Sequence, residues 1–203
     1  MGTRLLLARH GQTEWHAENR YAGSSEVALT EKGRTQAAAL ATYAQRVKPD
    51  ALFCSPRQRA RNTIQATAHA LGLTPEIVDD LRETHFGIAE GRTRDELRRT
   101  DPDAVERFLE DPVAGAFPGA DNPAEAAERG TRALREIAAR TTGTALVVAH
   151  NTLLRLSLCR LLGIPLATYR TVFPRLDNAA VTEVEVTGDR TALVRFNLPV
   201  DKG

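Results

Sequence analysis

The chain has 203 residues and a formal net charge of +1, with acidic and basic residues mixed along its length. This length suits one domain with a buried core. A nearly neutral chain has no overall field for holding nucleic acid or an anionic membrane, so any important positive charge must be local.

No apolar stretch approaches the roughly 18 residues that crossing a bilayer requires, and the run at 5–8 is too short for a signal-peptide core. We therefore expect a cytoplasmic protein with no membrane contact. The two cysteines, Cys54 and Cys159, lie far apart in the chain. We expect them to be reduced residues of the core rather than a disulfide.

The first predicted element is a strand at 4–8, a short apolar run that ends at His10 and suits burial on both faces. Thr30 is the expected N-cap of a helix that reaches about residue 45. A second strand is expected at 51–54. Ser55-Pro56 follows it, and because proline is tolerated in a first helical turn, we expect a helix from there to residue 70.

The second half of the chain continues the alternation. We expect a short strand at 76–78, helices at 93–99 and 102–109, and a loop at 112–123 rich in Pro, Gly and Asp. A helix at 124–140 precedes a buried strand at 145–149, and Asn151 or Thr152 caps a helix that ends near 162. Alternating patterns at 181–186 and 192–196 flank the Gly188-Asp189 turn and predict a hairpin or a late pair of strands.

Strands that alternate with helices predict an α/β fold of three layers, α/β/α, with a central, mostly parallel sheet. We expect a single domain over 1–203. Ligands of such sheets bind beyond the carboxyl ends of the strands. His10 and His150 each stand where a buried strand ends, so both side chains should project at that edge.

Arg9-His10-Gly11 places an imidazole beside a guanidinium, and the glycine lets backbone donors approach a ligand closely. This suits a phosphate-binding loop. The tripeptide alone favours a plainer interpretation, in which His10 only caps backbone groups at the end of its strand.

Longer stretches of the sequence resemble one known family in the right order over some three quarters of the chain. They are Leu7-Ala8-Arg9-His10-Gly11-Gln12-Thr13-Glu14-Trp15, Asn19-Arg20, Leu29-Thr30-Glu31-Lys32-Gly33, Ser55-Pro56-Arg57-Gln58-Arg59-Ala60, Thr63, Leu81-Arg82-Glu83, Phe86-Gly87, Glu90-Gly91 and Val147-Val148-Ala149-His150. In these stretches the chain resembles the histidine phosphatase superfamily, also called the phosphoglycerate mutase-like family.

The resemblance implies a phosphoglycerate mutase-like fold and a role for each matching residue. His10 would be the nucleophile and Glu83 the proton donor, while Arg9, Arg59 and His150 would bind the phosphoryl oxygens. Further phosphate-pocket donors would be Gln12, Thr13, His16, Arg20, Gly23 and Asn151. Because guanidinium groups can stabilise the loose transition state of phosphoryl transfer, this chemistry requires no metal or other cofactor.

Three departures from the family pattern concern the substrate side. His16 stands where the family often has asparagine, and we expect it still to donate a hydrogen bond to phosphate. Asn151-Thr152 replaces common glycines, and the segment 119–122 alters a lid element. We expect 92–123 to form a lid. His85 and Phe117 either shape the leaving-group pocket or serve packing.

The expected function is hydrolysis of small phosphomonoesters through a phosphohistidine. The first alternative is phosphoglycerate mutase-type transfer. A mutase must exclude water from the phosphoenzyme, and we expect the compact segment 92–123 to be too small a cover for that. The second is a phosphate-binding protein without catalysis, although such a protein has no need of a nucleophile opposite an acid. The partner is then a small substrate and not nucleic acid, and the chain is a monomer or a homodimer.

Overall fold

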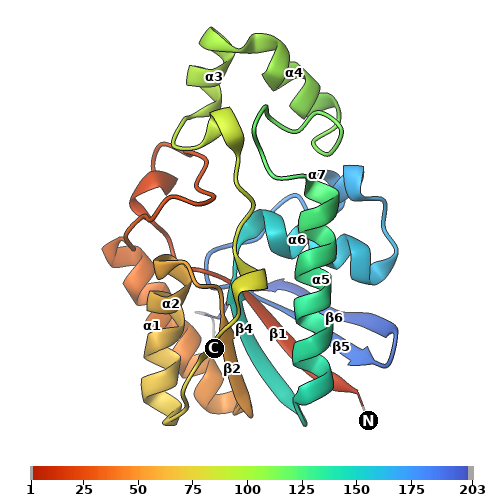
Figure 1. Ribbon diagram of the computed structural model, residues 1–203. Helices are drawn as coiled ribbons and strands as arrows, with labels where there is room; N and C mark the ends of the chain where they lie inside the picture. The colour runs from red at the N-terminus through yellow and green to blue at the C-terminus, as the bar shows by residue number, and fades with distance from the viewer. Residues whose placement is uncertain (1, 201–203) are drawn as a thin grey trace.

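The sheet has six strands, in the order β3-β2-β4-β1-β5-β6 (Figure 1). The computed structural model describes residues 2–200. The strands are β1 (Thr3–Arg9), β2 (Ala51–Cys54), β3 (Glu76–Ile77), β4 (Thr144–Ala149), β5 (Val181–Thr187) and β6 (Arg190–Leu198). The first four are parallel neighbours, whereas β5 pairs antiparallel with β1 and β6 pairs antiparallel with β5. The expected mostly parallel sheet is confirmed.

Helices cover both faces of this sheet. The helices are α1 (Glu31–Val47), α2 (Gln58–Leu71), α3 (Arg94–Thr100), α4 (Pro102–Glu110), α5 (Pro123–Arg140), α6 (Asn151–Leu162) and α7 (Tyr169–Val172), and those on the faces are α1, α2, α5 and α6. Successive β1 side chains point to opposite faces. Leu6 and Ala8 therefore pack with α1 and α2, whereas Leu5 and Leu7 pack with α5 and α6. This arrangement is the expected three-layer α/β/α fold.

Several details differ from the sequence-based expectation. The second helix begins at Gln58 rather than at Ser55-Pro56, and Arg57 is its N-cap. The Ser55 hydroxyl instead accepts a hydrogen bond from the Arg57 amide at 3.2 Å, and Nε2 of His150 lies 2.6 Å from it. Short elements that no periodic pattern had indicated are α7 and the 3₁₀ turns Glu14–His16, Asp79–Leu81, Gly87–Ala89 and Leu166–Thr168. Both cysteines are buried and free.

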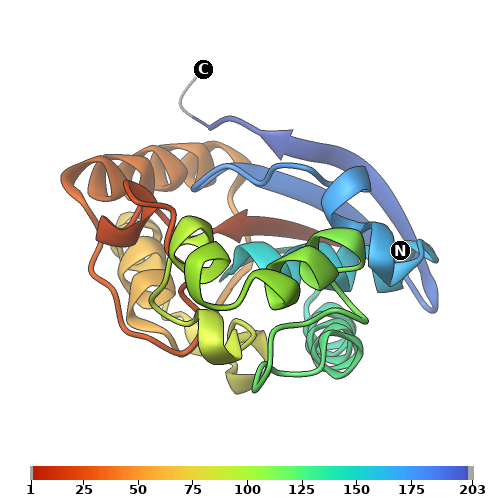
Figure 2. The same cartoon turned by 90° about the horizontal axis from the view of Figure 1, so that it is seen from above.

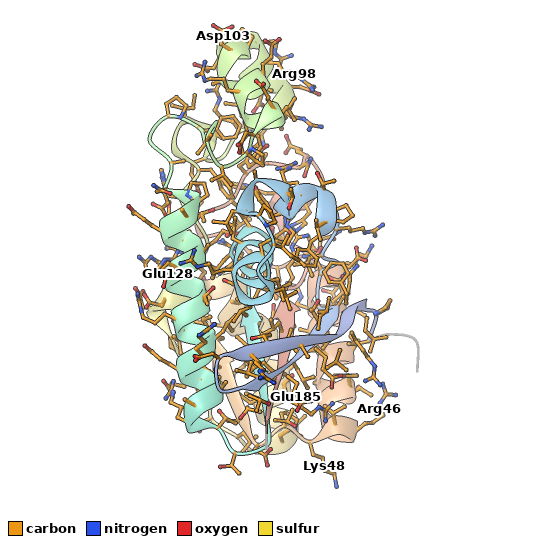
Figure 3. All side chains as sticks on the ribbon, turned by 90° about the vertical axis from the view of Figure 1, so that its right-hand side faces the viewer. Arg46, Lys48, Arg98, Asp103, Glu128 and Glu185 are labelled. Atoms are coloured by element: carbon orange, nitrogen blue, oxygen red, sulfur yellow. The ribbon has the colours of Figure 1, made fainter. Side chains whose placement is uncertain are left out.

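The segment 92–123 stands above the carboxyl ends of the parallel strands. Viewed from above, α3 and α4 extend across the centre of the molecule (Figure 2). Arg98 and Asp103 mark its outer tip, at the opposite end of the molecule from Lys48 (Figure 3). The segment contributes most of a separate apolar cluster, in which Phe108 and Phe117 stack with ring centroids 4.4 Å apart. Within residues 2–200, no helix is both long and apolar enough to cross a membrane.

Candidate active site

His10 and His150 come together at the ends of two paired strands. His10 follows β1 and His150 follows β4, and the pairing places Arg9 opposite Ala149. The His10 amide donates to the Ala149 carbonyl oxygen at 3.0 Å, which extends the pairing by one residue. The imidazole centroids lie 5.3 Å apart, and both side chains are buried.

A hydrogen bond fixes which ring nitrogen of His10 carries the proton. Its Nδ1 lies 2.8 Å from the Gly11 carbonyl oxygen, and because a carbonyl oxygen only accepts, Nδ1 carries the ring proton. Burial lowers the pKa of His10 well below its ordinary value, and the positive charges of Arg59 and Arg9 lower it further. The imidazole is therefore neutral near pH 7, and the nucleophilic lone pair is on Nε2.

Close contact with α1 holds the loop that follows His10. A Cβ atom on Gly11 would lie 2.6 Å from the Gly33 carbonyl oxygen, and one on Gly33 would lie 2.1 Å from the Gln12 carbonyl oxygen. Larger residues would force the loop and the helix apart. The Thr30 hydroxyl accepts from the Gly33 amide at 3.0 Å and donates to Oε1 of Gln12 at 2.9 Å. The Gln12 side chain thus supports the loop from its helix side.

Arg59 lies in the first turn of α2 and has no exposed surface (0%). Its Nη1 donates to the carbonyl oxygen of Ser25 at 2.8 Å, and its Nη2 donates to those of Ala22 at 3.0 Å and Gly23 at 2.8 Å. Nε is buried and has no partner within residues 2–200. The 22–25 loop therefore orients the guanidinium and leaves its Nε–H without an acceptor.

Glu90 in turn holds the loop that orients Arg59. Its Oε1 accepts from the Gly23 and Ser25 amides, each at 2.9 Å, and from the Ser25 hydroxyl at 2.7 Å. Its Oε2 accepts from the Phe86 amide at 3.3 Å. One carboxylate thus ties the segment that carries the Arg59 acceptors to the segment that begins with Glu83.

Glu83 is buried, with 5% of its surface exposed, and is held by backbone amides. Oε1 accepts from Thr84 at 3.0 Å and from Leu153 at 2.9 Å, whereas Oε2 accepts only from Thr152 at 2.9 Å. Thr152 and Leu153 belong to the first turn of α6, so the carboxylate caps that helix. Oε2 keeps a lone pair that the protein does not use.

The His16 ring is surrounded by hydrogen-bond donors. Its Nε2 lies 2.6 Å from Nη2 of Arg9 and 3.2 Å from Nδ2 of Asn178, and that Nδ2 also donates to the His10 carbonyl oxygen at 2.8 Å. Nε2 is therefore an acceptor for Arg9. Burial, and next the charge of Arg9, lower the pKa of His16 to about 4. This geometry differs from the expectation that His16 donates to phosphate.

His150 is fully buried, and only one of its ring nitrogens has a partner. Nε2 lies 2.6 Å from the Ser55 hydroxyl, whereas Nδ1 has no partner within residues 2–200. Burial lowers the pKa of His150 well below its ordinary value, and Arg59 adds to this effect. We call the group His10, Arg9, Arg59, Glu83 and His150 the floor of the site.

A pocket of about 260 Å³ opens at the floor. Of the residues predicted from the sequence, seven line it: Arg9, His10, Thr13, His16, Arg20, Glu83 and Asn151. Four are not part of the lining: Gln12, Gly23, Arg59 and His150. Arg20 is matched by acidic groups, since its guanidinium binds both carboxylate oxygens of Glu96, at 2.9 and 3.0 Å, and Glu18 at 2.6 Å.

Sequence reasoning missed three arginines of the lining. Arg94 begins α3, Arg155 lies in α6 and Arg170 lies in α7. We call these three residues the mouth of the pocket. A signal existed for Arg155, which interrupts an otherwise apolar run in its helix. His85 and Phe117 do not line this pocket, and Phe117 is packed in the apolar cluster of the segment 92–123.

The positive charge of the pocket comes from arginine side chains. Within residues 2–200, no group of three or more His, Cys, Asp or Glu side chains is arranged to hold a metal ion.

Comparison with known proteins places the chain in a family. The model of the family described as "Histidine phosphatase superfamily (branch 1)" matches residues 5–199. The chain belongs to this family. Bifunctional protein Rv2228c of Mycobacterium tuberculosis is 39% identical over 200 residues, which are 96% of this chain and 53% of that protein. The chain thus spans about half the length of the first curated relatives that it matches.

Two other similar proteins are named as phosphatases. Phosphoserine phosphatase 1 of Hydrogenobacter thermophilus is 28% identical over 201 residues, which are 98% of this chain and 94% of that protein. The native structure of the mycobacterial glucosyl-3-phosphoglycerate phosphatase Rv2419c has a TM-score of 0.88 at 27% identity. That match covers 98% of this chain and all of the other (100%).

Proposed function

We propose that this chain hydrolyses small phosphomonoesters and that Nε2 of His10 carries the phosphoryl group between the two half-reactions. The observation that supports this most strongly is a set of three buried nitrogens without partners: Nε of Arg9, Nε of Arg59 and Nδ1 of His150. Unsatisfied buried donors are costly in a folded protein. The oxygens of a phosphoryl group beside His10 are the acceptors that these nitrogens lack.

The first half-reaction forms the phosphoenzyme. The Nε2 lone pair of His10 attacks phosphorus, and the bond between phosphorus and the leaving-group oxygen breaks. A proton on Oε2 of Glu83 passes to that oxygen, so the leaving group departs as an alcohol. Arg9 and Arg59 offset the charge on the phosphoryl oxygens as the transition state forms.

The second half-reaction returns the enzyme to its starting state. Oε2 of Glu83 takes a proton from water while the water oxygen bonds to phosphorus, and the bond between Nε2 and phosphorus breaks. Inorganic phosphate leaves, and Glu83 holds its proton again. One carboxyl group thus serves both steps, and in our proposal the segment 92–123 acts as a lid over them.

The test compares wild type with His10→Ala, using His69→Ala as a control because His69 is exposed and outside the pocket. We expect wild type to hydrolyse p-nitrophenyl phosphate and His10→Ala to lose at least about 10³-fold in kcat. Acid-labile, base-stable label from a ³²P substrate should appear on wild type and His69→Ala only. Full activity of folded His10→Ala would overturn the proposal. Tracking isomerised product from 3-phosphoglycerate, with and without 2,3-bisphosphoglycerate, separates a phosphatase from a mutase.

A further inference from the structure

The mouth of the pocket carries positive charge that the protein does not neutralise. Within residues 2–200, Arg94, Arg155 and Arg170 form no ion pair with a carboxylate. Arg20, in the same lining, pairs with both Glu18 and Glu96. The contrast shows that pairing is available to an arginine of this pocket and that the other three are left without it.

Arg155 is the most deeply placed of the three, with 5% of its surface exposed. Its Nε donates to the Asn151 carbonyl oxygen at 3.1 Å, its Nη1 donates to that of Phe173 at 3.3 Å, and its guanidinium lies 5.0 Å from the Tyr169 ring centroid. These contacts orient the side chain without supplying a negative charge. A buried cation without a counter-ion costs free energy, so a role beyond packing is indicated.

Arg170 and Arg94 approach the same space from other elements. The Arg170 guanidinium lies 5.0 Å from the ring centroid of Phe108. This contact joins α7 to the segment 92–123. Tyr21 also lines the pocket. Burial raises the pKa of Tyr21, and the charges of Arg170 and Arg94 oppose that rise, as expected when both guanidiniums are near its hydroxyl. The three arginines therefore converge from α3, α6 and α7.

The phosphoryl group does not account for this charge. In the proposed function, Arg9 and Arg59 already face the phosphoryl oxygens. Glu83 is the one carboxylate among the lining residues that the structure describes, and its oxygens are engaged by backbone amides. A monoester with a neutral leaving group would therefore leave the arginines of the mouth unmatched.

We propose that Arg94, Arg155 and Arg170 form a second anion subsite, so that the preferred substrate carries an acidic group on its leaving-group portion. The group is an oxyanion, either a carboxylate or a second phosphate, because both match the planar fork of a guanidinium. This inference rests on the proposed function, since it assumes that the reacting phosphoryl group is bound at the floor.

The test measures binding, so that its outcome does not depend on turnover. His10→Ala protein is titrated calorimetrically with two matched pairs of ligands at 0.15 M salt, on the order of physiological ionic strength. In the first pair, 3-phosphoglycerate carries a carboxylate where glycerol 3-phosphate carries a hydroxymethyl group. In the second pair, fructose 1,6-bisphosphate carries a phosphate that fructose 6-phosphate lacks.

We expect the more acidic member of at least one pair to bind about tenfold or more tightly, an effect typical of a charge-assisted bidentate contact. Preference within the first pair identifies a carboxylate, and preference within the second identifies a phosphate. Adding Arg170→Gln or Arg155→Gln should bring the two affinities of the preferred pair to within about threefold.

Arg98→Gln is the matched control, because Arg98 lies on α3 beside the mouth but is exposed, pairs with Asp95 and is not part of the lining. It should leave the preference intact. Equal affinities within both pairs would overturn the second subsite, and so would a preference that survives Arg170→Gln and Arg155→Gln. Phosphoenzyme formation by wild type in the ³²P experiment would still stand in either case, so failure here is distinguishable from failure of the proposed function.

Discussion

The floor and the mouth of the pocket are built by different means. At the floor, charged and polar side chains are held by the backbone: Arg59 by three carbonyl oxygens, Glu83 by three amides and His10 by one carbonyl oxygen. At the mouth, Arg155 also donates to two carbonyl oxygens, but Arg170 is held by contact with an aromatic ring. Within residues 2–200, the arginines of the floor and of the mouth alike form no ion pair with a carboxylate.

The difference separates chemistry from selection. Backbone partners are fixed by the strands and helices that carry them, so the floor has one geometry, which suits a reaction that tolerates little misplacement. The mouth lies beyond the reacting group, so we expect its guanidiniums to act on the rest of the ligand. We therefore expect substitutions at the floor to change turnover and substitutions at the mouth to change the choice of ligand.

The largest expected effect on turnover is that of Glu83→Gln, which tests the chemical role of the floor. Without an ionisable group at this position, we expect kcat for an alkyl phosphate to fall by about 10²- to 10⁴-fold. p-Nitrophenolate leaves without needing a proton, so the first half-reaction with p-nitrophenyl phosphate should survive and the second should stall. Rapid mixing should then show a burst of p-nitrophenolate close to one equivalent, with labelled His10 accumulating.

A burst separates a chemical role of Glu83 from a structural one. The amide group of glutamine also places N–H donors against backbone donors, which costs about 1–3 kcal/mol of unfolding free energy. Equal losses for both substrates without a burst would show that Glu83 acts only as a helix cap, and the proposed proton transfer would then be wrong.

A smaller effect is expected from Glu90→Gln, because Glu90 acts through the loop that holds Arg59. Freed from its carboxylate, the loop should no longer fix the guanidinium, and we expect the dissociation constant for inorganic phosphate to rise about tenfold. Calorimetry of the folded variant measures this directly. Glu128→Gln, on the exposed face of α5, is the control. Loss of stability with unchanged phosphate affinity would contradict the positioning role.

The smallest effect concerns His16, whose pKa in the folded protein is about 4. The unfolded chain takes up a proton at this residue near pH 6.5, so it binds more protons than the folded chain between pH 6.5 and 4. Stability should therefore fall as the pH falls through this window. His16→Asn should reduce the loss between pH 7 and pH 5 by about 1 kcal/mol, after discounting for partial exposure. Urea unfolding at both pH values gives the difference.

His10 and His150 also have lowered pKa values and contribute in the same direction. Both remain in His16→Asn, so the difference between the two proteins isolates His16. Identical pH dependence of the two proteins would show that burial and the charge of Arg9 do not hold this ring neutral.

The meeting of His10 and His150 could be predicted because it depends on the strands alone. Each histidine ends a run of apolar residues, and parallel strands bring such ends to one edge of a sheet. The hairpin at the end of the chain was equally clear from its alternation and its turn. These predictions need only local patterns and one rule of topology.

Local sequence patterns do not predict the direction of a side chain in a loop or on a short helix. Arg9 ends β1 and Gln12 lies three positions further on, in the loop, yet Gln12 contacts Thr30 and Arg9 lines the pocket. Arg170 lies on a helix of four residues, which has no periodic pattern to read. The start of α2 was misplaced because the Ser55 hydroxyl contacts His150, a residue distant in the sequence.

The Glu83 carboxylate has a consequence for how this molecule can change over evolutionary time. Since it satisfies the first amides of α6, a lineage that abandoned phosphoryl transfer would still be under selection to retain it. The His10 Nε2 atom forms no hydrogen bond within residues 2–200, and Nδ1 contacts only the neighbouring Gly11 carbonyl oxygen, so selection for folding protects this imidazole less than it protects Glu83. Among related chains, a histidine at this position is therefore a better marker of surviving catalysis than the acid.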